Sequence, residues 1–281
     1  MIFSFDEQKA KVADFYSRVA PIYDHIGPTV FAYFGQRMVE LASIPPGAHV
    51  LDIATGRGAN LFASVERVGA TGKVVGIDIA QGMVDQTNNV IQSRGLKNAT
   101  VLHMDAEHLT FADNTFDYVL CNFAIFWLPN QEQALTEFFR VLRPHGTFGV
   151  TLPGGNDERW RWYQDLMNEY FQRFHVALPP LSPPSSVSVA RQPGTFQNLM
   201  SHVGFVQIRG TPVESDMIYA NEQEWWNAKW MHGERYPLEN MPSEMLAQFK
   251  DDVMAHMAPL KQNDGFHERW YVLCIFGNKP G

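Results

Sequence analysis

Short apolar runs alternate with amphipathic segments between residues 46 and 153. The run 116–122 is apolar enough to predict a central strand, and the segment 131–142 has the spacing of a helix. Strands that alternate with helices favour a parallel sheet whose faces are covered by helices. The expected strands are 50–53, 73–79, 99–106, 116–122 and 146–152.

This alternation does not continue on either side of the region. Residues 6–40 have a helical pattern with a break near Gly27 and Pro28. Beyond residue 153 we expect an aromatic helix over 160–174, and then a Pro/Ser stretch at 178–186 that crosses the surface or acts as a mobile lid. The later expected elements are a helix at 195–202, a strand at 204–210, a Trp- and Met-rich, mostly helical segment at 219–264, and a closing strand at 267–276.

The first apolar run ends in a turn of small residues that contains Gly56 and Gly58, and a helical pattern follows it. Glycine lets a backbone turn tightly and approach a ligand closely, and the next helix N-terminus favours a negatively charged ligand group. A dinucleotide site needs a third small residue where Leu61 stands, and no P-loop lysine follows the turn. Asp52, which precedes the turn, suits a ligand that carries an amino group and no pyrophosphate.

Two further expected strands also end in an acid. Asp78 follows the glycines by about twenty residues, where such folds place the carboxylate that accepts from ribose hydroxyls. Asp105 ends the third run, where its carboxylate suits an adenine amino group. Because the carboxyl ends of parallel strands meet at one edge of a sheet, these acids and the glycine turn predict one nucleoside site.

With these residues, the chain resembles the class I S-adenosylmethionine-dependent methyltransferases. Asp52-x-Ala54-Thr55-Gly56-x-Gly58 is similar to their first motif, Asp78 to their ribose acid, and Asp105-Ala106 to their adenine motif. The stretch 142–148 resembles the turn into their fifth strand, and the dense resemblance covers roughly residues 45–153. Within the family the ubiquinone/menaquinone-biosynthesis type and its natural-product relatives are the most similar. The chain departs from the pattern at Ala54-Thr55, where Gly and a small residue are commoner, and at Asn60, where an acid is frequent.

The resemblance implies an α/β, Rossmann-like, seven-stranded sheet of order 3-2-1-4-5-7-6 with the last strand antiparallel. It also implies S-adenosyl-L-methionine as the methyl donor and S-adenosyl-L-homocysteine as the product. The residues that it implies for donor binding are Tyr23, Asp52, Ala54, Thr55, Gly56, Gly58, Asn60, Asp78, Ile79, Met83, Asp105, Ala106, Asn122 and Phe123.

The same resemblance suggests how the chain is divided. Residues 1–45 are expected to form a helical lid over the donor, and residues 46–153 the donor-binding core. Two insertions, 154–194 and 219–264, are expected to form a cap over the acceptor. Segments 195–218 and 265–281 then complete the core sheet.

Composition excludes several classes of partner. The formal net charge is -8 and no Lys/Arg cluster is present, which disfavours DNA and RNA as substrates. The N-terminus has no basic region followed by an apolar core, and no apolar run reaches the roughly 20 residues of a membrane span. Cys121 and Cys274 are expected on strands that are not neighbours, so we expect no disulfide and a reducing cytoplasm. A homo-oligomer is left open.

Large aromatic residues crowd the two insertions, where they form either the cap's own core or a pocket for an apolar, aromatic acceptor. The acceptor atom is left open between carbon and oxygen. Methyl transfer needs no metal, and no metal-ligand spacing of Cys or His occurs. A base that takes the acceptor's proton is expected among His25, Glu169 and His175. The alternatives are a quinone-pathway C-methyltransferase and, in another class, a binding protein for S-adenosylmethionine without transferase activity.

Overall fold

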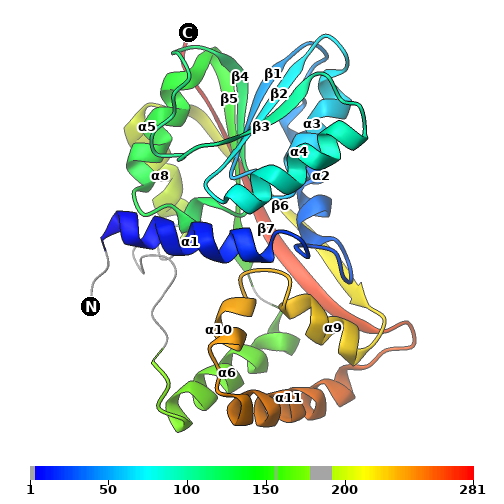
Figure 1. Ribbon diagram of the computed structural model, residues 1–281. Helices are drawn as coiled ribbons and strands as arrows, with labels where there is room; N and C mark the ends of the chain where they lie inside the picture. Colours follow the sequence, from blue (N-terminus) through cyan, green and yellow to red (C-terminus); the bar gives the residue numbers. More distant parts are fainter. Residues whose placement is uncertain (1–3, 156, 178–191) are drawn as a thin grey trace.

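The fold is a seven-stranded sheet with helices on both faces, seen in a computed structural model that describes residues 4–155, 157–177 and 192–281 (Figure 1). The strand order is β3-β2-β1-β4-β5-β7-β6, which confirms the order expected from the resemblance. β7 runs antiparallel to both of its neighbours, and β1 to β5 are parallel. The strands are β1 (His49–Ile53), β2 (Lys73–Asp78), β3 (Ala99–His103), β4 (Phe116–Cys121), β5 (Leu142–Gly155), β6 (Val206–Tyr219) and β7 (Phe266–Asn278).

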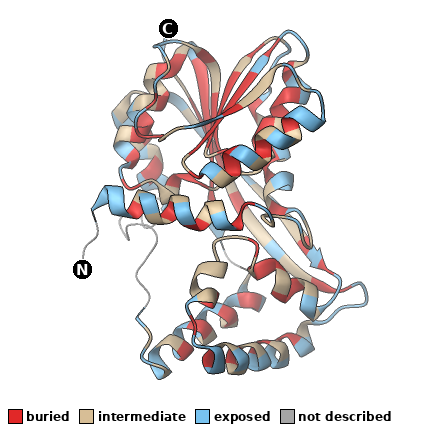
Figure 2. Cartoon of the chain, in the orientation of Figure 1, coloured by how far each residue is buried: buried red, intermediate tan, exposed pale blue. Residues whose placement is uncertain are grey.

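Two hydrophobic clusters hold helices against opposite faces of the sheet. One cluster packs α2 and α3 on the sheet, and the other packs α5 and α8 on its far side. The central strands are almost completely buried, as expected for parallel strands covered on both faces (Figure 2). The helices of the core are α2 (Val30–Ala42), α3 (Ala59–Val68), α4 (Gln81–Ser93), α5 (Gln131–Val141) and α8 (Pro193–Val203), with the 3-10 turn η1 (Ile125–Trp127).

A second layer of helices lies beyond the end of the sheet. β6 and β7 continue past their neighbours as a long antiparallel ribbon, and Figure 1 shows this ribbon leading into the helices of the cap. Trp160, Tyr163, Trp225 and Phe249 form the interior of the cap, with ring centroids of adjacent pairs 4.9–5.8 Å apart. The elements of the cap are η2 (Glu158–Trp160), α6 (Arg161–Arg173), α9 (Glu222–Lys229), α10 (Arg235–Glu239), α11 (Ser243–Met257) and η3 (Ala258–Leu260).

The helical pattern expected over 6–40 and its break near Gly27 and Pro28 are confirmed, but the break is longer than expected. α1 (Phe5–Val19) ends well before α2 begins, and the residues between them are not helical. Asp24 and Gly27 have positive φ values of 56° and 71° in this connection, which a continuing helix does not allow. α1 lies across the junction of core and cap (Figure 1). The Pro/Ser stretch at 178–186 lies outside the described residues.

Both cysteines are buried and free, as expected for residues on the non-adjacent strands β4 and β7. No helix within the described ranges is long and apolar enough to cross a membrane. Among those same residues, no group of His, Cys, Asp and Glu side chains is arranged to hold a metal ion.

Candidate functional site

The glycine turn joins β1 to α3 through three left-handed residues. Ala54, Gly56 and Gly58 have φ values of 49°, 53° and 85°. This explains why glycine is commoner at the position of Ala54, since a Cβ is strained there. A Cβ added at Gly58 would lie 2.6 Å from Phe62, whereas one at Gly56 would meet no atom within 4 Å. The open side of Gly56 therefore faces free space, where a ligand can approach the backbone.

Asp78 ends β2 and is held by backbone amides from two directions. Its Oδ2 accepts from the Gly56 amide at 2.8 Å, and its Oδ1 accepts from the Ala80 amide at 2.9 Å. Burial nevertheless raises the pKa of Asp78 to about 6. One carboxylate thus anchors the glycine turn, and each of its oxygens has acceptor capacity left for ribose hydroxyls.

Asp52 lies on β1 beneath the turn and is 1% exposed. Its carboxylate accepts from Thr55 Oγ1 at 2.5 Å and from Asn60 Nδ2 at 3.1 Å. Burial raises the pKa of Asp52 to about 7, against these two hydrogen bonds. Within the described residues, neither Asp52 nor Asp78 forms an ion pair. Two uncompensated carboxylates at one site favour a cationic ligand.

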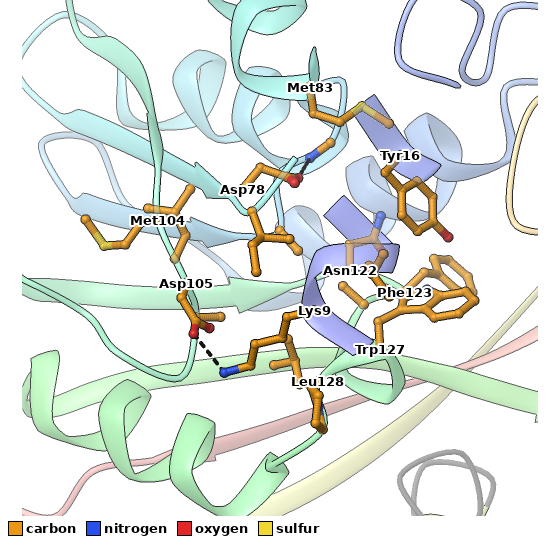
Figure 3. A pocket seen from close by; sticks show the side chains of 18 of the residues that line it. Lys9, Tyr16, Asp78, Met83, Met104, Asp105, Asn122, Phe123, Trp127 and Leu128 are labelled. Atoms are coloured by element: carbon orange, nitrogen blue, oxygen red, sulfur yellow. Dashed lines mark hydrogen bonds and ion pairs between the residues drawn. The ribbon is translucent and has the colours of Figure 1, made fainter. Parts of the chain in front are cut away.

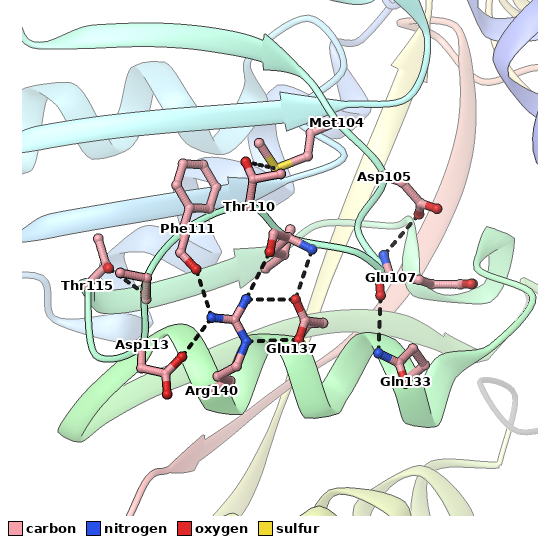
Figure 4. Close-up of polar contacts among 12 residues, drawn as sticks. Met104, Asp105, Glu107, Thr110, Phe111, Asp113, Thr115, Gln133, Glu137 and Arg140 are labelled. Carbon is pink, nitrogen blue, oxygen red and sulfur yellow. Dashed lines mark hydrogen bonds and ion pairs between the residues drawn. The ribbon is translucent and has the colours of Figure 1, made fainter.

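Asp105 has a different environment, which the sequence did not reveal. Its Oδ2 accepts from Lys9 Nζ of α1 at 2.8 Å (Figure 3) and lies 3.1 Å from His108 Nδ1. Its Oδ1 accepts from the Glu107 amide at 2.9 Å (Figure 4). Burial opposes ionisation, but these hydrogen bonds, led by that of Lys9, hold the pKa of Asp105 below its usual value. An adenine amino group would have to share this carboxylate with the lysine of the lid.

The loop that carries Asp105 is fixed from below by Arg140 of α5. The Arg140 guanidinium donates to the carbonyls of Leu109 and Phe111 at 2.9 and 2.7 Å (Figure 4). It also pairs with Glu137 and Asp113, each at 2.8 Å. These contacts hold the backbone that follows β3 in one position, so the site at its start is preorganised.

Two cavities meet at the carboxyl edge of the sheet. The larger measures about 390 Å³ and lies over the glycine turn, and the smaller, about 90 Å³, lies between the ends of β2 to β4 and α1. Tyr23, Ala54, Gly56 and Asn122 line both, so the two cavities are adjacent. Every residue that the resemblance implies for donor binding lines one of them.

α1 closes the smaller cavity and connects it to the cap. Tyr16 lines this cavity and packs edge-on against Trp127, with ring centroids 5.7 Å apart (Figure 3). Arg18 of α1 forms a two-pronged ion pair with Glu239 of α10, at 2.9 and 3.2 Å. The helix therefore contacts the core on one side and the cap on the other.

The structure does not bring together the three residues expected to act as a base. His25 is exposed and lines the outer part of the larger cavity. Glu169 and His175 are exposed at the far end of α6, and neither lines either cavity. They face solvent because the rings that precede them on α6 turn inward to form the cap interior.

Other residues at the site were missed by sequence reasoning. Lys9, Tyr16 and Trp127 line the smaller cavity, and Phe31 lines the larger. His232 belongs to the cap and contacts Phe31. Lys9 and Tyr16 share α1, but Trp127, Phe31 and His232 each come from a different part of the chain, so no single motif joins the five residues. Only their common aromatic or cationic character was visible in the sequence.

The residues present fit S-adenosylmethionine, whose sulfonium and ammonium groups are cationic. Asp52 and Asp78 supply negative charge without a protein cation, and Gly56 leaves the space that its Cβ would fill. Apolar side chains suited to an adenine ring line the smaller cavity, among them Ile79, Met83 and Ala106. The two cavities thus match this donor in charge and in the apolar lining available to its adenine ring.

Comparison with known proteins agrees with this geometry. The model of a family described as a methyltransferase domain matches residues 50–146. Aklanonic acid methyltransferase DauC of Streptomyces sp. (strain C5) is 36% identical over 52% of this chain and 66% of that protein. Nocamycin O-methyltransferase of Saccharothrix syringae is 27% identical over 86% of this chain and 91% of that protein. Demethylmenaquinone methyltransferase of Listeria welshimeri is 26% identical over 59% of this chain and 72% of that protein.

The fold is also shared with solved structures. A SAM-dependent methyltransferase from Aquifex aeolicus superimposes with a TM-score of 0.51 at 17% identity, covering 99% of each chain. A structure described as the [4+2]-cyclase SpnF superimposes with a TM-score of 0.58 at 18% identity, covering 97% of each chain. At such identities the likeness concerns the fold, and chemistry has to be argued from the site.

Proposed function

We propose that this chain, which belongs to the S-adenosylmethionine-dependent methyltransferases, methylates carbon or oxygen of an apolar, aromatic small molecule of secondary metabolism. The donor lies across the two adjacent cavities, with its adenosine in the smaller one. Relatives named for aklanonic acid and nocamycin support an acceptor of this class. The free, buried cysteines suit a reducing compartment such as the cytoplasm.

The observation that carries the proposal is the pair of uncompensated carboxylates at the glycine turn. Asp78 accepts from the ribose hydroxyls while it holds the turn through the Gly56 amide. Asp52, with Thr55 and Asn60 as its donors, places negative charge near the amino end of the methionine. Bound S-adenosylmethionine supplies a methyl group that its sulfonium charge already activates for displacement.

The protein contributes position and the exclusion of water. Asn122 donates to the Phe31 carbonyl at 3.2 Å and accepts from Thr151 Oγ1 at 2.7 Å, so the end of β4 is tied to the start of α2. Phe123, which follows, has a positive φ of 50°, a conformation that costs energy for a residue with a Cβ. Tyr23 stacks on Phe31 at 5.2 Å and covers the junction of the two cavities. An acceptor held in line with the methyl group reacts fast because orientation supplies much of the acceleration.

The test is methyl transfer from S-adenosylmethionine labelled in its methyl group. The acceptors are aklanonic acid, demethylmenaquinone and the hydroxyanthraquinone alizarin, each incubated separately. We expect label in at least one of them, and addition of S-adenosylhomocysteine should suppress the transfer. Donor binding without label in any acceptor would contradict the proposed acceptor class and favour a binding protein. Label in demethylmenaquinone alone would instead point to the quinone pathway.

A further inference from the structure

A cluster of aromatic rings fills the junction of lid, core and cap. Phe31 lies at its centre, with ring centroids 5.4 Å from Phe123, 5.8 Å from His232 and 6.5 Å from Trp270. These rings come from α2, the end of β4, the segment before α10, and β7. Phe31 also stacks on Tyr23, which covers the junction of the two cavities. The cluster therefore begins where the methyl group of a bound donor is expected.

His232 is the imidazole within this cluster. Its ring is partly buried and stands nearly perpendicular to Phe31, at 77°. Across the described part of the chain, its ring nitrogens form no hydrogen bond. The next residue, Gly233, has no room for a large side chain, because an added Cβ would lie 3.3 Å from the Trp127 ring and 3.4 Å from Tyr16 Oη. His232 is thus next to the wall of the smaller cavity, which Tyr16 and Trp127 line.

Charged groups approach His232 from the elements around it. Lys229 of α9 is 2% exposed and pairs with Glu234 at 3.3 Å and with Glu268 of β7 at 3.2 Å. Burial, and then Lys229, lowers the pKa of His232 to about 3, while Glu268 opposes that shift. Tyr16 of α1 and Asp24 of the lid face the same junction. Burial raises the pKa of both, so both stay neutral up to a higher pH than usual.

We propose that His232 accepts the proton of an acceptor hydroxyl group, and that the acceptor is a flat hydroxyaromatic molecule bound among these rings. This inference rests on the proposed methyl transfer and deepens it. The acceptor hydroxyl gives its proton to an imidazole nitrogen, and an oxygen lone pair forms the bond to the methyl carbon. The electron pair of the breaking carbon–sulfur bond goes to sulfur, and His232 then releases the proton to solvent.

The surroundings favour this role and this acceptor. The oxygen becomes strongly acidic as its bond to carbon forms, so the imidazole needs to be neutral and well placed more than strongly basic. Glu268 favours the imidazolium that results, and Lys229, which pairs with Glu268, opposes it. Phe31, Phe123 and Trp270 offer flat apolar ring surfaces, which favour an acceptor with an aromatic body.

The test compares wild-type protein with His232→Gln, which keeps a polar side chain but cannot take up a proton. At saturating donor and acceptor, the rate of label transfer to the methylated aromatic acceptor should fall by about a hundredfold or more. The Kd of S-adenosylhomocysteine, from calorimetry, should change less than about twofold, because His232 lines neither donor cavity. With an aromatic acceptor whose hydroxyl group is still protonated at pH 8, the variant's rate should rise by about tenfold per pH unit as hydroxide replaces the base, whereas the wild-type rate should be nearly flat between about pH 6 and 8.

His256→Gln is the matched control, since His256 is exposed on α11 of the same cap and stacks on Trp162. It should leave the rate and the pH profile unchanged. Equal rates for wild-type and His232→Gln would overturn the role of His232 and leave the methyltransferase intact. Wild-type protein that labels no aromatic acceptor would contradict the acceptor class, and the inference with it.

Nuclear magnetic resonance of ring-labelled histidine gives a readout that does not depend on turnover or on the folding of a variant. With S-adenosylhomocysteine bound, addition of alizarin should shift the His232 resonances in the wild-type protein. Unchanged His232 resonances at saturating alizarin would show that the ring does not touch the acceptor, and would overturn the proposal.

Discussion

The core and the cap, which face each other across the donor site, differ in whether their buried charges are paired. On the core side, Asp52 and Asp78 are buried without a cationic partner among the described residues, and burial raises the pKa of both. On the cap side, Glu234 and Glu268 surround Lys229, and the three groups compensate one another. A buried charge that is paired costs the folded state little, whereas an unpaired buried charge costs stability until a ligand arrives. The unpaired charges therefore belong to the surface that binds the donor, and the paired charges belong to the interior of the cap.

The largest effect should come from removing the cation that pairs with the two carboxylates of the cap. Lys229→Met leaves Glu268, which is 15% exposed on its side chain, without its cation. We expect the free energy of unfolding to fall by about 3 kcal/mol in urea titrations, because an unpaired buried charge is expensive. Adding Glu268→Gln should recover part of the loss. A single variant as stable as wild type would mean that the cluster does not hold the cap together.

A smaller effect of opposite sign should follow from removing charge on the core side. The folded-state pKa of Asp52 is raised to about 7 from 3.8, so the folded state binds the proton more tightly than the unfolded state does. Stability of the ligand-free protein is therefore lost as pH rises from about 4 to 7. Asp52→Asn cannot ionise, so its melting temperature at pH 8 should exceed that of wild type by about 2 °C or more.

The same variant should bind the donor worse, and the surface substitution Asp251→Asn should change neither property. Calorimetry should show at least a tenfold weaker Kd for S-adenosylmethionine, since the cationic donor loses the carboxylate that compensates it. A variant that is less stable than wild type at pH 8 would show that Asp52 is a structural group, and the contrast between core and cap would not hold.

Asp78→Ala tests the ribose contact. It should weaken donor binding by about 1–3 kcal/mol, because the ribose hydroxyls lose their hydrogen bonds to a charged carboxylate. S-adenosylhomocysteine should lose affinity to the same extent as S-adenosylmethionine, because both carry the same ribose. An unchanged affinity for either would overturn the assignment. The loop should also loosen, because Asp78 Oδ2 accepts from the Gly56 amide.

The smallest effect concerns backbone strain at the turn. Ala54 has a φ of 49°, which glycine adopts without penalty, so Ala54→Gly should change the free energy of unfolding by less than about 1 kcal/mol, in the stabilising direction. The donor Kd should stay within about twofold. Chemical denaturation measures the free energy of unfolding, and calorimetry measures the Kd. A clear loss of stability would show that Ala54 is not strained in the wild-type protein.

The difference between the two sides also explains what the sequence reveals. Asp52 and Asp78 lie at the ends of neighbouring parallel strands, and Gly56 lies in the turn after the first of them. Strand order and the glycine turn are therefore enough to place them together. The strand order expected from the resemblance is the observed one. Local spacing was sufficient here because the carboxyl edge of a parallel sheet gathers its own strand ends.

The cap side could not be predicted in this way. Phe31, His232 and Trp270 meet only because β6 and β7 extend past the sheet and carry the cap back toward α2. No hydrophobic periodicity in the sequence indicates that extension. By residue type alone, exposed residues such as Glu169 and His175 could not be told apart from His232 as bases. The pairing of Lys9 with Asp105 was missed for the same reason, since it joins the first helix to the loop that follows β3.

The most direct test is a crystal structure with S-adenosylhomocysteine bound. We predict ribose hydroxyls within hydrogen-bond distance of Asp78 and the sulfur atom at the junction lined by Tyr23 and Asn122, facing Phe31 and the cap. The account would be contradicted by a sulfur atom that faces away from the aromatic cluster, or by an adenosine bound outside the two cavities. Either result would mean that the core does not hold the donor with its methyl group facing the cap.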